Sequence, residues 1–396
     1  MYMGVAKRFG LLEIMLAVYP ILISYKFFGL PMHELWAIFM AVVAFLKSGK
    51  LYHNKILLIF IIYMIVHQIL IALMLSNVPS YFYNNLITFM IPPICLFFIV
   101  PSLDYVKLRN SVLLVGIVCM IGMLYQATIT ISGGTVSPIK IPFMQDPGEE
   151  SRFYEINNRP SSFFLEPSNY AIFMLVPLMM TLLEKQYAFA YLIVFFNFLS
   201  TSTNGIILSV VILVVYFIQE RLSFGKLFSV LLFAAIIGYV VLDTDLFSLG
   251  VEKATTTELS ENMRMANGLI LVQGMDPWQL ITGFIAPNAL DFYYSSAYHG
   301  HELFMHEDFV DVYLPTFWRC LAQYGIVALI LYCIFHIKLL KKRMFLLPFF
   351  VYLFISWFSV GSFVNGNFMF MICFIITAGD YYASLTNKTN FKKELN

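Results

Sequence analysis

Residues 110–131 read NSVLLVGIVCMIGMLYQATITI, and this apolar run decides the fold. None of its side chains carries a formal charge. A helix needs about 20 apolar residues to cross the hydrocarbon core of a bilayer. The run therefore predicts a transmembrane helix over 110–131.

The rest of the chain has the same character. Of its 396 residues, 60% are hydrophobic and 12% are charged, and the mean hydropathy is +0.80. Soluble domains carry about 25% charged residues. The formal net charge of +1 gives no reason to expect a nucleic-acid partner. We therefore expect residues 1–396 to form one all-α transmembrane domain surrounded by membrane lipids.

Eleven further apolar runs are candidate spans, which makes about twelve in all. They are 9–27, 32–46, 56–76, 82–101, 167–184, 187–201, 204–219, 226–242, 320–338, 344–361 and 366–384.

Two segments between these runs are too polar to cross a membrane. Residues 132–166 predict a first extracytoplasmic loop, and residues 243–319 predict a larger one. Within the larger loop, 257–273 predicts a short amphipathic helix, which the Gly, Asp and Pro residues of 274–277 would end.

The basic residues orient the predicted spans. If the N-terminus is cytoplasmic and the spans alternate, seventeen of the 24 Lys and Arg residues fall inside and seven fall outside. Short cytoplasmic loops carry an excess of Lys and Arg in membrane proteins. We therefore predict that both termini are cytoplasmic and that both long loops lie outside.

Three of the arginines on the predicted outer face stand out, because they lie there against this charge bias. They are Arg159, Arg264 and Arg319. A guanidinium can bind two phosphate oxygens at once, so several of them would suit a lipid-linked diphosphate. The alternative is that each arginine simply reaches lipid headgroups at the interface.

An acidic residue, Glu166, precedes Pro167, which we expect to begin the helix of a span. A helix N-terminus stabilises a carboxylate as the anion. A general base would need a raised pKa instead. We therefore expect Glu166 to position a sugar hydroxyl or an arginine, although a purely structural role at the helix start stays open.

Three histidines of the larger loop, His299, His301 and His306, offer a candidate general base. A metal site is the weaker reading, because the His-x-His spacing lacks further ligands. The chain also lacks nucleotide-binding and serine-hydrolase motifs, so we expect neither metal nor cofactor. The remaining interpretation is that these loop histidines are simply solvated.

His67 and Gln68 interrupt a predicted span, and they predict hydrogen bonds between helices.

Four stretches resemble the Wzy-type O-antigen polymerases and the related O-antigen ligases of bacterial envelopes. They are RPSSFFLEPSNYA at 159–171, LSTSTNG at 199–205, Arg264 with PWQLITGF at 277–284, and FWRCLAQYG at 317–325. The layout of many spans with a long late outer loop is also similar.

The resemblance implies a metal-independent glycosyltransferase at the periplasmic face of the bacterial inner membrane. It would polymerise undecaprenyl-diphosphate-linked repeat units into O-antigen, with lipid-linked glycans as donor and acceptor and a chain-length regulator protein as partner. Arginines would stabilise the departing diphosphate. The implied catalytic residues are Arg159, Glu166, Arg264 and His301, and the implied substrate contacts are Ser168, Tyr170, Arg319, Tyr324, His299 and His306.

Two alternatives remain. A ligase of the same superfamily would transfer finished glycan to the lipid A core. A flippase or transporter would show charged or broken helices near the membrane midplane. The predicted spans hold almost no charge, and polar residues gather in the outer loops, which favours surface chemistry.

Overall fold

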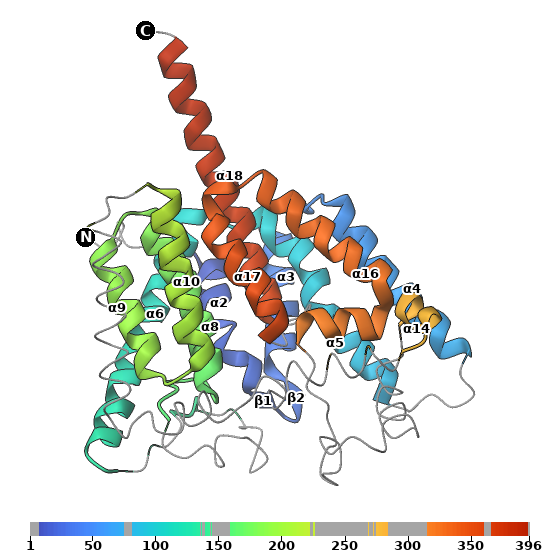
Figure 1. Ribbon diagram of the computed structural model, residues 1–396, viewed down its shortest axis with the longest axis horizontal. Helices are drawn as coiled ribbons and strands as arrows, with labels where there is room; N and C mark the ends of the chain where they lie inside the picture. Colours follow the sequence, from blue (N-terminus) through green and yellow to red (C-terminus); the bar gives the residue numbers. More distant parts are fainter. Residues whose placement is uncertain are drawn as a thin grey trace.

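The structure, a computed structural model, is a bundle of helices (Figure 1). It describes residues 8–74, 81–134, 136, 139–142, 144, 159–221, 225, 268, 272, 275–283, 315–359 and 366–394. The statements below concern these residues.

Each predicted span within the described residues corresponds to helical structure. The α-helices are α2 (Leu11–Val18), α3 (Met32–Ser48), α4 (Lys55–Met74), α5 (Tyr81–Ile99), α6 (Tyr105–Ile131), α8 (Pro167–Leu183), α9 (Tyr187–Leu199), α10 (Thr203–Gln219), α14 (Pro277–Thr282), α16 (Thr316–Lys341), α17 (Leu347–Ser359) and α18 (Gly366–Glu394). The short 3-10 helices are η1 (Ile21–Ser24), η2 (Val100–Ser102) and η5 (Met344–Leu346). The predicted span 226–242 lies outside the described residues.

Three helical segments are long and apolar enough to cross a membrane. They are Tyr105–Ile131, Thr316–Lys341 and Gly366–Leu385, and shorter apolar helices pack beside them. The described chain is therefore consistent with an all-α membrane protein. The number of twelve spans stays a prediction.

The first predicted span, 9–27, is wrong as one continuous helix. Helix α2 ends at Val18, and η1 follows Pro20, which has no N–H to continue an α-helical hydrogen-bond ladder. The chain then turns through the short antiparallel pair β1 (Lys26–Phe27) and β2 (Leu30–Pro31), in which Lys26 faces Pro31. The described chain thus contains one short two-stranded turn beside its helices.

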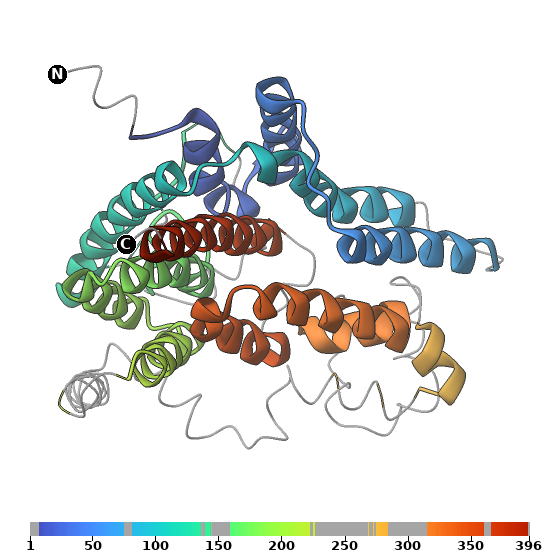
Figure 2. The same cartoon turned by 90° about the horizontal axis from the view of Figure 1, so that it is seen from above.

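Helices α8 and α18 form the centre of the bundle. Nearly every residue of α8 is buried, as expected of a helix that is apolar on all sides. Phe173 of α8 stacks on Phe370 of α18 with ring centroids 5.8 Å apart. Seen from above, α18 lies between α8 and the helices α3 and α5 (Figure 2). The core is therefore built around two helices that come from opposite halves of the sequence.

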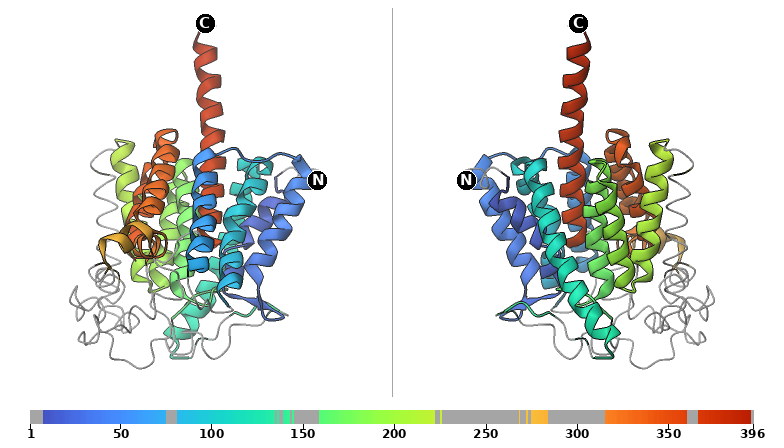
Figure 3. Two further views of the ribbon diagram at one scale, coloured as in Figure 1. Left: turned by 90° about the vertical axis from the view of Figure 1, so that its right-hand side faces the viewer. Right: turned by 90° about the vertical axis from the view of Figure 1, so that its left-hand side faces the viewer.

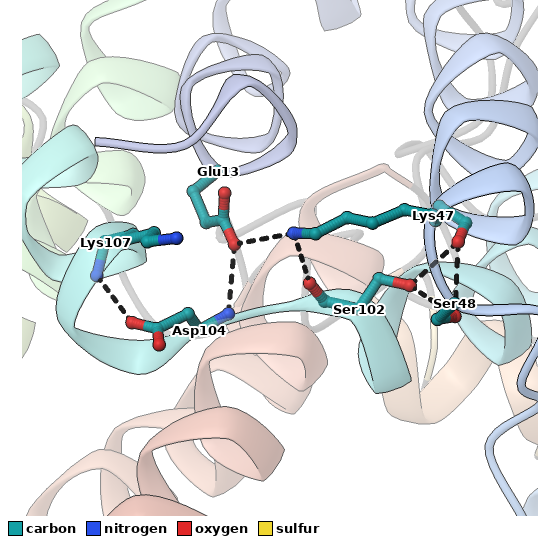
Figure 4. A network of polar contacts seen from close by, with 7 residues as sticks. Glu13, Lys47, Ser48, Ser102, Asp104 and Lys107 are labelled. Carbon is teal, nitrogen blue, oxygen red and sulfur yellow. Dashed lines mark hydrogen bonds and ion pairs between the residues drawn. The ribbon is translucent and has the colours of Figure 1, made fainter. Parts of the chain in front are cut away.

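A polar network marks one end of the bundle (Figure 4). Glu13 of α2 is fully buried and accepts a hydrogen bond from the Asp104 backbone N–H, at 3.0 Å. Its carboxylate also lies 3.7 Å from the Lys47 ammonium of α3, which donates to the Ser102 carbonyl at 2.9 Å. The network therefore joins the start of α2, the end of α3 and the start of α6.

A second ion pair lies at this same end. Arg109, in the first turns of α6, pairs with Glu184 at the end of α8, at 2.9 Å. Tyr382 of α18 donates to the same carboxylate at 3.0 Å. We call this the terminal end, because α2 begins here and α18 leaves the bundle here (Figure 3).

The opposite end, which we call the far end, holds the β1–β2 turn, the end of α6, the start of α8 and the turn between α9 and α10. The helices from α2 to α10 run between the two ends in alternate directions. Helix α16 runs in the same direction as α10, and the predicted span 226–242 between them lies outside the described residues. Which end faces the cytoplasm stays a prediction from the charge bias.

Candidate functional site

The segment before α8 is fixed to α6 by one glutamine. The Oε1 atom of Gln126 accepts hydrogen bonds from the backbone N–H groups of Ser161 and Ser162, at 2.9 and 2.6 Å. Both serines are fully buried, and Ser162 has a positive φ of 58°. The Ser162 hydroxyl donates to the Cys119 carbonyl at 2.8 Å. A polar side chain in a mostly apolar helix thus supplies the hydrogen-bond partner that the backbone of this segment would otherwise lack.

Tyr25 secures the same segment from the other side. Its hydroxyl donates to the Phe163 carbonyl at 2.8 Å, and the side chain is almost fully buried. The chain from Arg159 to Glu166 therefore has a defined path between α6 and the residues before β1.

Arg159 contacts the turn between α9 and α10. Its Nε donates to the Thr201 hydroxyl at 2.6 Å, and its Nη2 donates to the Thr201 carbonyl. Thr201 is buried and has a φ of 56°, a left-handed conformation that aims its carbonyl out of the helical path. Within the described part of the chain, the other N–H groups of the guanidinium have no hydrogen-bond partner. They remain able to bind an anion.

The same two stretches meet a second time, through a glycine. Gly205 of α10 packs directly on Ala171 of α8, and a Cβ at position 205 would overlap the Ala171 methyl. The first two stretches of the resemblance, 159–171 and 199–205, therefore form one structural unit. The sequence did not predict that they would meet.

Glu166 is the N-cap residue of α8, and Pro167 begins the helix as predicted. Its side chain accepts a hydrogen bond from the Ser168 hydroxyl at 2.9 Å instead of capping the helix backbone. Burial lowers the pKa of the Arg159 guanidinium, while the negative charge of Glu166 raises that pKa. Glu166 therefore acts electrostatically on Arg159.

The two tyrosines with predicted substrate contacts lie in the core instead. Tyr170 is fully buried and packs edge-on against Phe164, with ring centroids 6.0 Å apart. Tyr324 is 4% exposed and stacks with Phe89 at 6.4 Å. Both rings are therefore buried within the helix bundle, and their contacts with substrate stay a prediction.

Arg319 belongs to a second group of residues, around α14 and α16. It lies half-buried in α16, which is broken at Gly325, so the predicted span 320–338 is not straight.

Helix α14 begins where the sequence predicted a helix end. Asp276 caps it, and Pro277 occupies its first turn. Proline is favoured at that position because its missing N–H would have no helical partner there.

Four predicted site residues, Arg264, His299, His301 and His306, lie outside the described residues. Among the residues that the structure does describe, no group of three or more His, Cys, Asp or Glu side chains could hold a metal ion.

Sequence reasoning missed Thr201 and Gln126. Thr201 lay within a stretch that carried the resemblance, and Gln126 was a polar residue inside a predicted span. Either signal could have identified these residues as fixed points of the site.

Comparison with known proteins adds nothing to this assignment: no family model matches the chain, and no curated protein or solved structure matches it either.

Proposed function

We propose that the chain is a glycosyltransferase that polymerises polyprenyl-diphosphate-linked repeat units at the extracytoplasmic side of a bacterial inner membrane. One observation carries the proposal. Arg159 is held against Thr201, close to Glu166, at the far end of a bundle of apolar helices. A partly desolvated arginine with unused N–H groups suits the diphosphate of a lipid-linked glycan.

The reaction needs an acceptor hydroxyl to attack the anomeric carbon of the donor glycan. The bond from that carbon to the diphosphate oxygen breaks, and the diphosphate leaves with its lipid. Negative charge grows on the departing oxygen in the transition state, where a fixed guanidinium is most effective. Arg159 meets this requirement because Thr201 holds its side chain before substrate arrives.

The proton of the acceptor hydroxyl must also be removed. We assign this step to the larger loop, with His301 as the favoured base. Glu166 has a different part. Its charge acts on Arg159, and its carboxylate is already engaged by Ser168, so it orients the arginine and the start of α8.

One observation favours a transporter as the second candidate. Helix α16 is broken at Gly325, and broken helices occur at the binding sites of carriers. In those carriers the freed backbone groups contact the cargo. Here Gln68 and Tyr63 of α4 bind two carbonyls at the break. We therefore prefer the transferase.

The first test compares arginine variants in a strain lacking the gene for this chain. Arg159→Ala should abolish long surface glycan, with a loss of roughly a hundredfold or more in transfer, as for other oxyanion-stabilising groups. Arg159→Lys should restore little, because an ammonium cannot bind two oxygens in one plane. Exposed Arg221→Ala is the matched control. Glycan ladders and immunoblots of the membrane fraction supply the readout.

The deletion strain itself separates the candidate functions. Surface glycan that stops at one repeat unit indicates a polymerase. Polymer that accumulates on its lipid carrier indicates a ligase, and repeat units retained at the cytoplasmic face indicate a flippase. Normal ladders in Arg159→Ala, at normal protein levels, would exclude Arg159 from the reaction.

A further inference from the structure

Helix α16 contains a glycine break that exposes backbone carbonyls. Gly325 has φ 75° and ψ −179°, a conformation essentially restricted to glycine. Carbonyls just before such a break lose their helical N–H partners. Inside an apolar bundle each unpaired carbonyl is costly, so other donors must bind them.

Helix α4 supplies those donors from one face. The Gln68 side-chain amide donates to the Gln323 carbonyl, and the Tyr63 hydroxyl donates to the Tyr324 carbonyl, both at 3.0 Å. His67 contacts the Thr282 carbonyl through Nε2. These bonds confirm the prediction that His67 and Gln68 join helices. We call Tyr63, His67 and Gln68 the α4 clamp.

The bonds of the α4 clamp fix the tautomer of its histidine. A carbonyl only accepts, so His67 Nε2 carries the proton toward Thr282. The Gln68 amide lies 3.2 Å from His67 Nδ1, which must therefore be the acceptor. The Gln68 nitrogen thus uses both of its hydrogens, one toward Nδ1 and one toward the Gln323 carbonyl. His67 is neutral in this arrangement.

A second glycine, Gly283, allows the end of α14 to pack directly against the break in α16. Gly283, at the end of α14, has φ 74° and ψ 179°, nearly the same conformation as Gly325. A Cβ at position 283 would lie 2.6 Å from the Gly325 nitrogen. The two backbones therefore touch, and Figure 2 shows α14 beside α16 at the edge of the bundle. His67 binds the residue just before Gly283.

The segment before the break carries Arg319, a predicted substrate contact, and Trp318. Arg319 lies one helical turn before Gln323. Its neighbour Trp318 packs directly on Gly268, four residues beyond Arg264 in the sequence. Any rotation of α16 at Gly325 would move Arg319 and the Trp318 side chain that packs on Gly268.

We propose that the α4 clamp positions α14 and the start of α16 for glycan transfer. It holds α14 and the α16 break in one arrangement, so that Arg319 and the segment at Gly268 keep their places relative to the bundle. Tyr63, His67 and Gln68 are then positioning residues that touch no substrate. This inference rests on the proposed function.

Hydrogen exchange on the full chain in lipid nanodiscs tests the clamp independently of activity. His67→Phe keeps the ring but removes both nitrogens, and Tyr63→Phe removes only a hydroxyl. Each should speed amide exchange over 277–283 about tenfold, the change expected for losing roughly one hydrogen bond. Exchange over 199–205, in the Thr201 turn, should not change. Val66→Ala, at a residue 47% exposed on the same helix, is the control variant.

Glycan ladders from the same variants test the positioning role. His67→Phe should shorten the ladder, and His67→Gln should restore it, because its amide can still donate to the Thr282 carbonyl. Unchanged exchange over 277–283 in His67→Phe would overturn the clamp. Faster exchange with an unchanged ladder would overturn its role in transfer. If the wild-type chain made no polymer, the proposed function would fail, while the exchange comparison would still decide whether the clamp holds α14.

Discussion

Individual polar side chains fix the far end of the bundle. Arg159, Gln126 and Tyr25 each bind backbone carbonyls or N–H groups of segments distant in the sequence. Such contacts give the outer segment a single path although it is not helical. In an apolar bundle, leaving a buried polar group unpaired costs more free energy than forming its hydrogen bond gains. Removing such a contact is therefore expected to destabilise the chain by more than the bond itself contributes.

Gln126 gives the most direct prediction at this scale. Gln126→Leu would leave two buried N–H groups, those of Ser161 and Ser162, without their acceptor. We expect the free energy of unfolding to fall by roughly 2–5 kcal/mol. Thermal unfolding in detergent measures the change, with Tyr125→Leu, at an exposed neighbour, as the control. Equal melting temperatures for the two variants would contradict the account.

The start of α8 was foreseeable at the residue scale, but its surroundings were not. Glu166 followed by Pro167 is a local signal, and the helix begins there. The contact of Arg159 with Thr201 joins residues 42 positions apart. No local preference encodes that contact, since it arises from the packing of α8 against α10.

Three whole elements were predicted closely. Helices α8, α9 and α10 begin and end within two residues of their predicted bounds. Other bounds differ more, since α6 and α16 begin four or five residues early and α18 ends ten residues late. Two apolar runs are also interrupted, at Pro20 and Gly325. An apolar run shows that a segment is buried in the membrane, but tertiary contacts decide whether its helix continues.

The glycine break predicts an unequal set of alanine effects. Gly325→Ala should severely destabilise the chain, because it combines a positive φ with a clash against the Ile281 carbonyl. Gly29 has a φ of +80° but nothing within 4 Å of its Cβ position. Gly29→Ala should therefore show only the conformational cost, about 1–2 kcal/mol. Melting temperatures of both variants decide the point, and a milder effect at Gly325 than at Gly29 would refute it.

The described bundle has a polar terminal end, a middle part whose exposed side chains are mostly apolar, and a far end that holds the candidate site. Exposed apolar residues such as Leu73 of α4 and Ile121 of α6 face outward, where lipid would cover them. The charge bias predicts that the terminal end is cytoplasmic. Helix packing defines the arrangement of the described helices, whereas the orientation in the membrane is predicted from the charge bias alone.

Cysteine labelling in spheroplasts tests the orientation. A membrane-impermeant maleimide should label a Phe28→Cys variant, in the β1–β2 turn, but not a Lys50→Cys variant beyond α3. Of the native cysteines, four are buried and Cys333 is half-buried, so Cys333→Ser gives a suitable background. The opposite labelling pattern would place the candidate site in the cytoplasm and remove the basis for the proposed function.

The most direct measurement uses the purified chain in nanodiscs with undecaprenyl-diphosphate-linked repeat units. Wild-type protein and Arg221→Ala should both yield a ladder of longer glycans and release undecaprenyl diphosphate, whereas Arg159→Ala should yield almost none. A wild-type reaction that leaves only single repeat units, or an Arg159→Ala ladder equal to that of wild type, would contradict the account.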